Sequence, residues 1–566
     1  MRPLVHLFPS PEERARLLAV SRGEAPPELA ILGARVADVY TGVWVEANLE
    51  VALGRIAYLG PRRPRLGKDT EVMEARGLYV VPGYLEPHAH PWVLYNPLSL
   101  LEALVPQGVT LLVYDDLLLR LRLGGEGAAR VRRALADLAL PARILWSVRL
   151  APQSLLSEAE EEAFSREALS LLNDPLVACS AEITRWSKAV AGEEGLLRGV
   201  ARAQALGRRA EAHGAGASSD RLAALAAAGL EADHEAIRPG EVLERLRLGF
   251  WTMLRHSSLR PDLPDLLQGL SPPLPSRLLL TTDGAAPSFY ARGGFPTLLE
   301  AVAERAGPLE ALRLATLNPA TFLGLDGLLG GVAPGRLADF LLLEKPGPFR
   351  PLAVYLGGKA VAREGRLLHP LPPWPWGGPM AFAEAPFADP ERYRLGPAPA
   401  FRLENAVITR RAEASSGALA AFLLDPGGRW RVGAWVEGLM PGLEGMATTF
   451  TAAGGLLVLG RDPVSMAEAA GTVARLGGGV AWAKGGRVVW ARSFPLWGYM
   501  LQGPFSEALQ VEEELWAWAR EAGYAHGDVL YTLLFLTCDF LPELRLTPQG
   551  VLEVKAGRLW TRPEPF

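Results

Sequence analysis

The chain has 566 residues, of which 49% are hydrophobic and 21% charged, and its formal net charge is −4. This length predicts two to four domains of a soluble globular protein, and the small negative charge excludes the large basic field that attracts nucleic acid or a membrane surface. The two cysteines exclude a disulfide framework, and the sequence shows neither a secretion signal nor an apolar span of about 20 residues, so a cytoplasmic location is predicted.

The first predicted element is a short helix near the start of the chain. Ser10, Pro11 and Glu13 form a capping box with proline at the first helical position, which marks a helix start. Short strands with turns follow in "LAILGARVADVYTGVWVEANLEVALGRIAYLG". Residues 1–75 are therefore predicted to be an N-terminal helix and the first part of a small β domain.

Between residues 76 and 330, short apolar runs alternate with helical stretches. The runs are "LYVVPGYLEPHAH", "GVTLLVYDD", "ARILWSVRL", "PLVACSAEI", "RRAEAHG", "LEADHEA", "GFWTML" and "RLLLTTD". Repeated strand–helix alternation indicates parallel β/α units, and about eight of them predict a TIM-like (β/α)8 barrel. The strand that begins near Leu78 would be the first, and "RLLLTTD" would be the eighth.

The remainder of the chain divides into three predicted parts. Residues 331–370 return to β character and are expected to complete the small β domain as a composite β-sandwich. Residues 371–400 are predicted to be a proline-rich connector, which begins within "PLPPWPWGGP" at residues 370–379. Residues 401–566 are predicted to be an α+β domain, in which a helix and then a hairpin lie within "VSMAEAAGTVARLGGGVAWAKGGRVVWARS".

Metal-capable side chains stand where the apolar runs end. His88 and His90 share one face of an extended strand, which suits one metal ion or two solvated histidines equally. Four further residues occupy the ends of later runs: Glu182, His213, His234 and Asp283. In a barrel these ends meet at one face, and four histidines with two carboxylates can hold one or two divalent ions. A lone histidine is more often structural, but six such placements together favour a metal site.

The four other histidines have no comparable setting and are interpreted as surface or packing residues: His6, His256, His369 and His526.

The stretch "VVPGYLEPHAH" resembles the opening signature of the amidohydrolase superfamily, metal-dependent hydrolases built on a (β/α)8 barrel. The order HxH, carboxylate or lysine, His, His, Asp is that superfamily's ligand order. Glutamate at the fourth strand end is similar to the adenine deaminases, as are "HGAGAS", "LNPATFLGLDGLLGGVAPGRLADFLLL" and the C-terminal segments "GLEGMATTFTAAGG" and "FLTCDFLPELRLTPQG". The resemblance covers nearly the full length and implies a C-terminal domain of the adenine deaminase type.

The chain departs from that pattern at several positions. Glu86 stands where the superfamily usually has aspartate, and the nearest lysine to Glu182, Lys188, lies six residues on. "PWVLYNP" replaces an acidic, serine-rich stretch after the histidine pair, Gly284 replaces a second acid, and "TAAGG" replaces a histidine-bearing stretch. The last three departures concern the pocket, so they indicate a divergent sub-branch and leave the substrate open.

The predicted roles follow from the chemistry of the residues. A divalent ion lowers the pKa of bound water from about 15.7 toward 7, which makes hydroxide available. Asp283 can accept the proton of that water and pass it to the leaving nitrogen. Glu235 is either the proton donor to the substrate ring or a carboxylate that orients a ligand histidine.

Three residues after the histidine pair are predicted to contact a planar base by stacking and hydrogen bonding, with loop packing as the alternative for the two rings: Trp92, Tyr95 and Asn96.

The leading hypothesis is a metal-dependent aminohydrolase that converts adenine and water to hypoxanthine and ammonia. The alternative is an amidohydrolase acting on another purine, a pterin or a cyclic amide, and a non-catalytic binding protein is a third class that the complete ligand set disfavours. The resemblance implies manganese, with iron, zinc or cobalt also suited to the ligands. The expected partners are a small purine substrate and copies of the same chain in a homo-oligomer. Neither nucleic acid nor a membrane is expected as a partner.

Overall fold

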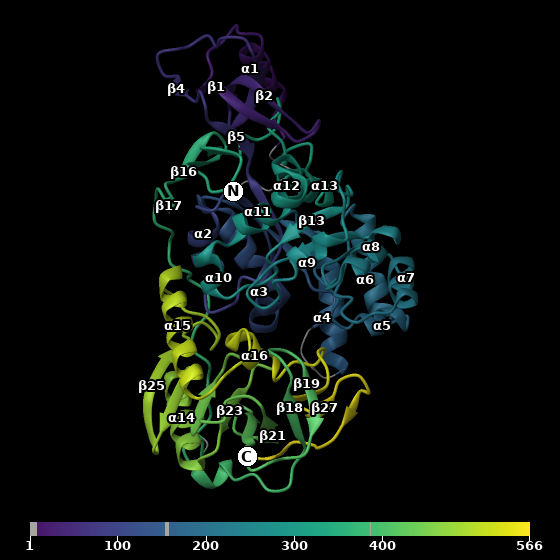
Figure 1. Cartoon of the computed structure of the whole chain (residues 1–566), viewed down its shortest axis with the longest axis vertical. Helices are drawn as coiled ribbons and strands as arrows, with labels where there is room; N and C mark the ends of the chain where they lie inside the picture. The colour runs from purple at the N-terminus through teal and green to yellow at the C-terminus, as the bar shows by residue number, and fades with distance from the viewer. Residues whose placement is uncertain (1–7, 153–157, 385) are drawn as a thin grey trace.

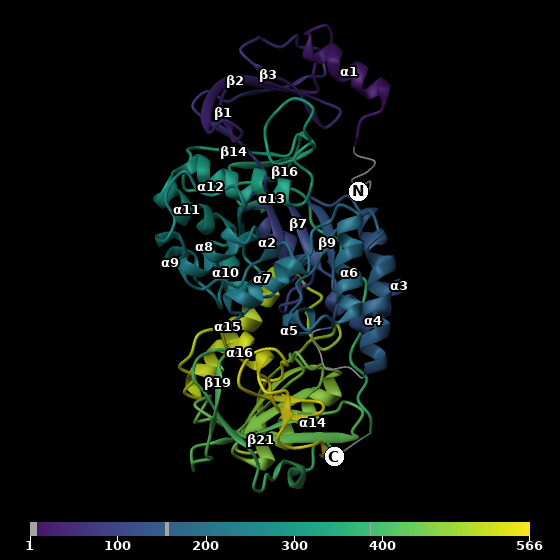
Figure 2. The same ribbon diagram turned by 90° about the vertical axis from the view of Figure 1, so that its right-hand side faces the viewer.

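A computed structural model describes residues 8–152, 158–384 and 386–566 (Figure 1). Three groups of elements are stacked along the long axis of the molecule, and they remain stacked when it is turned by 90° (Figure 2). A β-sheet with one helix lies at one end, parallel strands surrounded by helices lie in the middle, and the C-terminal elements lie at the other end.

Helix α1 (Pro11–Ser21) begins where the capping box predicts. The Ser10 hydroxyl accepts a hydrogen bond from the Glu13 amide at 3.2 Å, and the Glu13 carboxylate accepts one from the Ser10 amide at 2.8 Å. Both contacts satisfy amide groups that the first helical turn leaves without partners.

Strands from two distant segments share one nine-stranded sheet. Its path is β17-β16-β15-β14-β5-β1-β2-β3, with β4 paired to β1, and β14 pairs antiparallel with β5. The bounds are β1 (Leu29–Asp38), β2 (Val43–Ala52), β3 (Arg55–Gly60), β4 (Glu71–Glu74), β5 (Tyr79–Pro82), β14 (Phe340–Leu343), β15 (Ala353–Leu356), β16 (Lys359–Arg363) and β17 (Arg366–Leu367). The two segments expected to form one small β domain therefore lie in one continuous sheet, because β5 and β14 join them edge to edge.

Eight parallel strands carry the centre of the molecule. They form two sheets, β6-β7-β8-β9 and β10-β11-β12-β13, whose edges meet through parallel bridges at Ile183–Ala212 and Ala89–Asp283. The strands are β6 (Tyr84–Ala89), β7 (Val109–Asp115), β8 (Arg143–Val148), β9 (Val177–Ser180), β10 (Glu211–Ala212), β11 (Ala232–Asp233), β12 (Trp251–Arg255) and β13 (Leu278–Thr281). Every predicted apolar run contains one of these strands.

Helices follow the strands in the predicted alternation. They are α2 (Ser99–Leu104), α3 (Leu117–Ala136), α4 (Glu158–Leu171), α5 (Trp186–Val190), α6 (Glu194–Ala205), α7 (Ser219–Ala227), α8 (Pro239–Arg247), α9 (Leu263–Gln268), α10 (Pro287–Arg292), α11 (Phe295–Ala306), α12 (Pro308–Ala315) and α13 (Leu317–Phe322). The amphipathic stretches bury one face, as Leu196, Gly199, Val200 and Ala203 do in α6.

The first predicted strand is two strands in the structure. Residues 79–82 form β5 in the nine-stranded sheet, and residues 84–89 form β6 among the parallel strands. Gly83 lies between them, where a Cβ atom would approach the Thr110 hydroxyl to 2.2 Å. Only glycine leaves room for this close packing at the point where the chain passes from one sheet to the other.

The C-terminal elements form a second nine-stranded sheet and a three-stranded sheet β26-β27-β28. The predicted helix and hairpin are α14 (Pro463–Leu476) followed by β24 (Gly479–Lys484) and β25 (Arg487–Ser493). The other elements are η2 (Pro390–Tyr393), β18 (Ala400–Leu403), β19 (Thr409–Ala412), β20 (Leu419–Leu424), β21 (Trp430–Glu437), β22 (Gly445–Thr448), β23 (Leu456–Gly460), α15 (Phe505–Glu521), α16 (Val529–Phe535), β26 (Leu544–Thr547), β27 (Gly550–Glu553), β28 (Arg558–Leu559) and β29 (Glu564–Pro565).

Among the described residues, none of the helices combines the length and the apolar character that crossing a membrane requires.

Candidate metal centre

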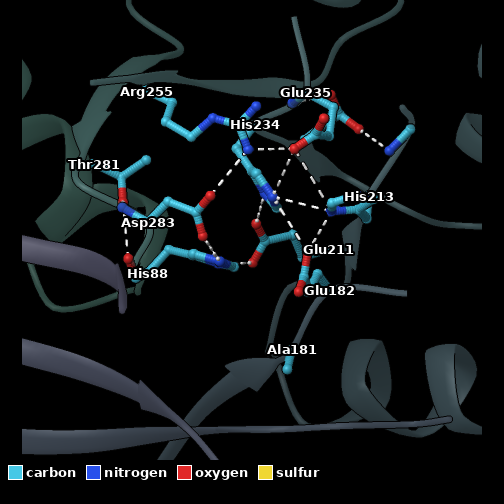
Figure 3. Close-up of polar contacts among 12 residues, drawn as sticks. His88, Ala181, Glu182, Glu211, His213, His234, Glu235, Arg255, Thr281 and Asp283 are labelled. Atoms are coloured by element: carbon cyan, nitrogen blue, oxygen red, sulfur yellow. Dashed lines mark hydrogen bonds and ion pairs between the residues drawn. The ribbon is translucent and has the colours of Figure 1, made fainter. Parts of the chain in front are cut away.

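The structure brings all six predicted ligand residues together. Figure 3 labels His88, Glu182, His213, His234 and Asp283 among them. His88 lies within β6, and the others follow the ends of β6, β9, β10, β11 and β13 by one or two residues. The cluster contains two sets whose ligand atoms lie within 4.8 Å of one another: His88, His90 and Asp283, and Glu182, His213 and His234. The strands converge at this face, so residues far apart in sequence form one cluster.

The two sets are connected through Glu182. Asp283 Oδ1 lies 3.3 Å from His88 Nε2 and 3.1 Å from His90 Nε2. Glu182 Oε2 lies 2.6 Å from His213 Nδ1 and 3.2 Å from His234 Nε2, and its Oε1 lies 3.6 Å from His90 Nε2. Glu182 therefore stands between the sets, with one oxygen turned toward each.

A carboxylate that the sequence reasoning missed, Glu211, holds two of the histidines. Its two oxygens lie 3.0 Å from His88 Nδ1 and 2.8 Å from His234 Nδ1. A carboxylate only accepts hydrogen bonds, so each imidazole donates from Nδ1 and turns Nε2 toward the cluster. The signal was present in "EAH", because Glu211 and His213 are two residues apart at the end of β10, as His88 and His90 are at the end of β6.

The donor set fits a divalent cation. With Nδ1 of His88 committed to Glu211, its Nε2 presents a lone pair to His90 Nε2 at 3.2 Å and to the Asp283 carboxylate. In addition, His213 Nε2 is buried and has no hydrogen-bond partner among the described residues. Lone pairs and carboxylates facing one another need a positive charge between them, and imidazole and carboxylate suit manganese, iron or zinc.

The pKa values of His234 and Glu211 also show that this cluster favours a positive charge. Burial and the neighbouring His88 lower the pKa of His234, but the hydrogen bonds that it donates to Glu182 and Glu211 outweigh them and raise it to about 10. Burial also raises the pKa of Glu211, yet the charge of His88 prevails and brings it to about 2. Protons and a metal ion compete for such nitrogens.

Glu86 is buried and connects the first strand to the last. Its carboxylate accepts hydrogen bonds from the Thr281 hydroxyl at 2.6 Å, the Thr282 amide at 2.8 Å and the His88 amide at 3.2 Å. Burial raises the pKa of Glu86 to about 7. The residue that replaces the expected aspartate thus fixes the backbone beside His88 and Asp283, outside the ligand cluster.

Two arginines that sequence reasoning did not single out border the carboxylates. Arg255, the last residue of β12, lies 2.9 Å from Asp283 Oδ2 and also pairs with Glu235. Arg149 Nη2 lies 2.6 Å from Glu182 Oε1. Burial raises the pKa of Glu235, but the charge of Arg255 outweighs it and lowers the pKa to about 2. Both arginines stand at strand ends, the one signal that the sequence offered.

A cavity of about 360 Å³ opens over the cluster. One side is lined by His90, Glu182, His213, Glu235 and Asp283. The opposite side comes from the C-terminal elements and includes Val407, Tyr499, Tyr531, Leu534, Phe535 and Phe540. The ring of Phe540 packs edge-on against His213 at 5.8 Å. The C-terminal elements therefore close the cavity from above.

Each of the three departures expected in the pocket contributes residues to the cavity wall. Trp92 and Val93 from "PWVLYNP", Gly284, and residues 451–454 from "TAAGG" all line the cavity. None of them is among the clustered metal-capable groups of the described chain.

Only one of the three predicted base contacts lines the cavity. Trp92 does, and its indole N–H donates to the Asp115 carbonyl at 3.2 Å. Tyr95 and Asn96 are buried behind it: the Tyr95 hydroxyl donates to the Ala285 carbonyl at 2.8 Å, and the Asn96 amide to the Leu501 carbonyl at 3.0 Å. Their polar groups hold the loop and the C-terminal elements, so the structure does not support them as substrate contacts.

The other histidines have separate surroundings. His256 borders a second cavity, His369 is exposed, and His526 Nε2 lies 2.7 Å from the Gly438 carbonyl. His6 lies outside the described residues.

Two protein families match this sequence. Residues 79–361 match the amidohydrolase family, and residues 402–558 match the adenine deaminase C-terminal domain. A protein of Halalkalibacterium halodurans, named "Putative adenine deaminase BH0637", is 32% identical over 95% of each chain. A protein of Deinococcus deserti named "Adenine deaminase" is 32% identical over 97% of this chain and 98% of its own.

Proposed function

The chain belongs to the adenine deaminase family of amidohydrolases, hydrolases that act on C–N bonds, and we propose that it converts adenine and water to hypoxanthine and ammonia with the help of a bound divalent metal. The observation that carries the proposal is the cluster of six ligand residues at the floor of a cavity that the C-terminal elements close. The cavity lies within the range of about 300–1,000 Å³ that small-molecule sites occupy.

The proposed metal site has room for one or two ions. His88, His90 and Asp283 would hold one, and His213 and His234 the other, with Glu182 shared between them. Manganese is the expected metal, and iron or zinc would also suit these ligands. When bound, such an ion lowers the pKa of water toward 7 and so supplies a nucleophile at neutral pH.

Asp283 is the proposed proton carrier. Its Oδ1 faces His88 and His90, while its Oδ2 is held by Arg255 at 2.9 Å. A carboxylate so oriented accepts a proton from the attacking water and returns it to the departing nitrogen, which leaves as ammonia. Its backbone has a positive φ of 61°, a strained conformation for a residue other than glycine and one that clusters at active sites.

Glu235 is proposed to position charged groups around the substrate. Its Oε1 pairs with Arg255 and lies 3.7 Å from His213 Nδ1 and 3.5 Å from His234 Nε2. Pairing with Arg255 keeps this carboxylate charged, which favours the orienting role over proton donation to the ring.

The scaffold beneath this site is proposed to be a closed (β/α)8 barrel. The parallel bridges Ile183–Ala212 and Ala89–Asp283 join both edges of the two four-stranded sheets, which supports closure. A homo-oligomeric assembly with a small purine as the bound partner completes the proposal.

Another cyclic amidine or amide is the second candidate substrate. Leucine and phenylalanine side chains make up much of the cavity wall away from the candidate metal ligands. This wide apolar surface favours a substrate larger than a single purine, such as a pterin.

The test is ammonia release after metal loading. Protein stripped of metal is reconstituted in parallel with manganese, iron and zinc, and adenine is compared with a panel of purines, pterins and cyclic amides. Wild type should release ammonia from adenine, and Asp283→Asn should lower kcat/KM about 10²- to 10⁴-fold. The exposed Asp326→Asn is the matched control and should match wild type. If the protein binds metal in stoichiometric amount but releases no ammonia from adenine, the assigned substrate becomes the panel compound that reacts.

A further inference from the structure

A tyrosine from the C-terminal elements reaches the metal-ligand side of the cavity. Tyr531 lies in α16 (Val529–Phe535), is buried, and lines the cavity together with Asp283 and His90. The Tyr531 hydroxyl lies beside Gly284, the residue after Asp283. A Cβ atom on Gly284 would lie 2.6 Å from the Tyr531 oxygen and 3.1 Å from His90 Cβ. The hydroxyl therefore sits directly against the backbone that carries Asp283.

Gly284 makes this approach possible. Any side chain at this position would meet the phenol oxygen below normal contact distance, so the absence of a Cβ creates the space that the hydroxyl fills. The glycine at position 284 and the position of Tyr531 therefore depend on each other, although the two residues are almost 250 positions apart in the sequence.

The hydroxyl is held in place from its own helix. Asp528 caps α16, and its carboxylate accepts the Tyr531 backbone amide at 3.1 Å. The next residue, Thr532, is fixed at both sides: its hydroxyl donates to the Ala406 carbonyl at 2.7 Å and lies 2.6 Å from the Tyr524 hydroxyl. The ring of Tyr531 packs against Phe535 at 5.4 Å. The Tyr531 ring is therefore held in position by contacts that do not involve its hydroxyl oxygen.

Within the described part of the chain, the Tyr531 hydroxyl has no hydrogen-bond partner. Two other uncharged donors of the cavity wall are occupied, because the Trp92 indole donates to the Asp115 carbonyl and the Thr451 hydroxyl to the Gly455 carbonyl. A preorganised O–H that faces a cavity beside reactive groups is suited to a ligand acceptor.

We propose that Tyr531 is a substrate-binding residue whose hydroxyl donates a hydrogen bond to a ring nitrogen of the heterocycle held over the metal centre, and that the missing side chain at Gly284 leaves the space for this hydroxyl. The inference rests on the proposed function, because a cyclic amidine offers ring nitrogens as acceptors next to the attacked carbon. The C-terminal elements would then contribute to substrate selection as well as to closure of the cavity.

The test compares Tyr531→Phe with wild type on adenine and on its 1-deaza, 3-deaza and 7-deaza analogues, each of which replaces one ring nitrogen by C–H. Tyr531→Phe should lower kcat/KM for adenine about 10- to 100-fold. For one analogue, wild type should lose a similar factor and Tyr531→Phe should lose nothing further, a coupling that a merely structural role would not produce.

Two variants serve as controls. Tyr393→Phe removes a buried phenol of the C-terminal elements whose hydroxyl donates to the Phe387 carbonyl outside the cavity lining, and it should leave kcat/KM within about twofold of wild type. Gly284→Ala should lower activity in the wild-type background by displacing the hydroxyl, and should cost less in the Tyr531→Phe background.

Equal losses of Tyr531→Phe on all four substrates, or activity equal to wild type, would overturn the inference while leaving the deaminase assignment intact. Wild type that turns over none of the four would overturn the proposed function and this inference with it. The two failures are therefore distinguishable in one set of assays.

Discussion

Glu211 shows how a single buried carboxylate orders the candidate metal centre. It is almost fully buried and accepts a hydrogen bond from Nδ1 of both His88 and His234. The two histidines belong to opposite ligand sets, so one side chain orients nitrogens in both. Residues that orient metal-bound histidines in this way raise metal affinity without touching the ion.

Replacing Glu211 by glutamine should weaken metal binding. A glutamine has one acceptor oxygen, so it can accept from only one of the two imidazoles, and its amide group would face the other. We expect metal affinity to fall about 10- to 100-fold, measured by chelator competition at fixed pH. Glu304→Gln, an exposed position on α11, is the control. Equal affinities of Glu211→Gln and wild type would contradict the orienting role.

At residue level, the sequence predicted which side chains lie at strand ends, but it did not predict which residues these side chains contact. The six candidate ligand residues were picked out because each lies at the end of an apolar run. Arg149 and Arg255 also end runs, but nothing local distinguishes an arginine that pairs with a buried carboxylate from one that is solvated. Tyr95 and Asn96 follow the histidine pair as Trp92 does, yet the loop turns them away from the cavity.

The elements themselves follow local rules closely, and the exceptions occur where sheets meet. The capping box, the eight strand-forming runs and the C-terminal helix and hairpin are confirmed. The run from Leu78 to His90 was predicted as one strand because it is apolar throughout. Its division at Gly83 depends on Thr110 of a neighbouring strand, a contact that periodicity cannot reveal.

Helices α10 and α15 are joined by a buried acid that makes stability depend on pH. Glu512 accepts hydrogen bonds from the Ser288 amide at 2.6 Å and the Ser288 hydroxyl at 2.7 Å. Burial raises the pKa of Glu512 from 4.5 to about 7, with Asp528 adding to the effect and Ser288 and Arg292 opposing it. The folded chain thus holds this proton more tightly than the unfolded chain does.

The stability contribution of Glu512 should be fully present below about pH 4.5 and be lost as the pH rises through about 7. The loss is on the order of 3 kcal/mol. Glu512→Gln imitates the protonated form, so its free energy of unfolding relative to wild type should rise between pH 5 and pH 8 in urea titrations. Glu513→Gln, an exposed neighbour on α15, should run parallel to wild type. A constant difference for Glu512→Gln at both pH values would refute the assignment.

The whole molecule is held together across the cavity. The Leu501 amide donates to the Leu94 carbonyl at 2.7 Å, and the Phe505 amide to the Glu102 carboxylate at 2.7 Å. Trp374, from the proline-rich segment expected to be a connector, is fully buried and packs edge-on against Trp92 at 6.4 Å. The C-terminal elements and the parallel strands therefore share one buried boundary around the candidate metal centre.

Because the centre lies at this shared boundary, metal binding should stabilise the whole chain. A free metal concentration 100 times the Kd should add about 2.7 kcal/mol to the free energy of unfolding. Calorimetry with metal and with chelator should show a higher Tm for both parts of the molecule when metal is present. His88→Ala should abolish the shift, and His369→Ala, at an exposed histidine, should retain it. A shift in only one of two separate transitions would contradict this coupling.

The sequence by itself determined the order of strands and helices and the six candidate ligand positions, because side-chain periodicity, capping and strand-end placement are local properties of the chain. Its motifs also carried the resemblance to the family. Only the tertiary structure decided that Glu211 joins two histidines, that Arg149 and Arg255 face the carboxylates, and that Tyr531 fills the space beside Gly284. These contacts join segments far apart along the chain, and their geometry depends on how sheets and helices pack, which no local pattern of residues specifies.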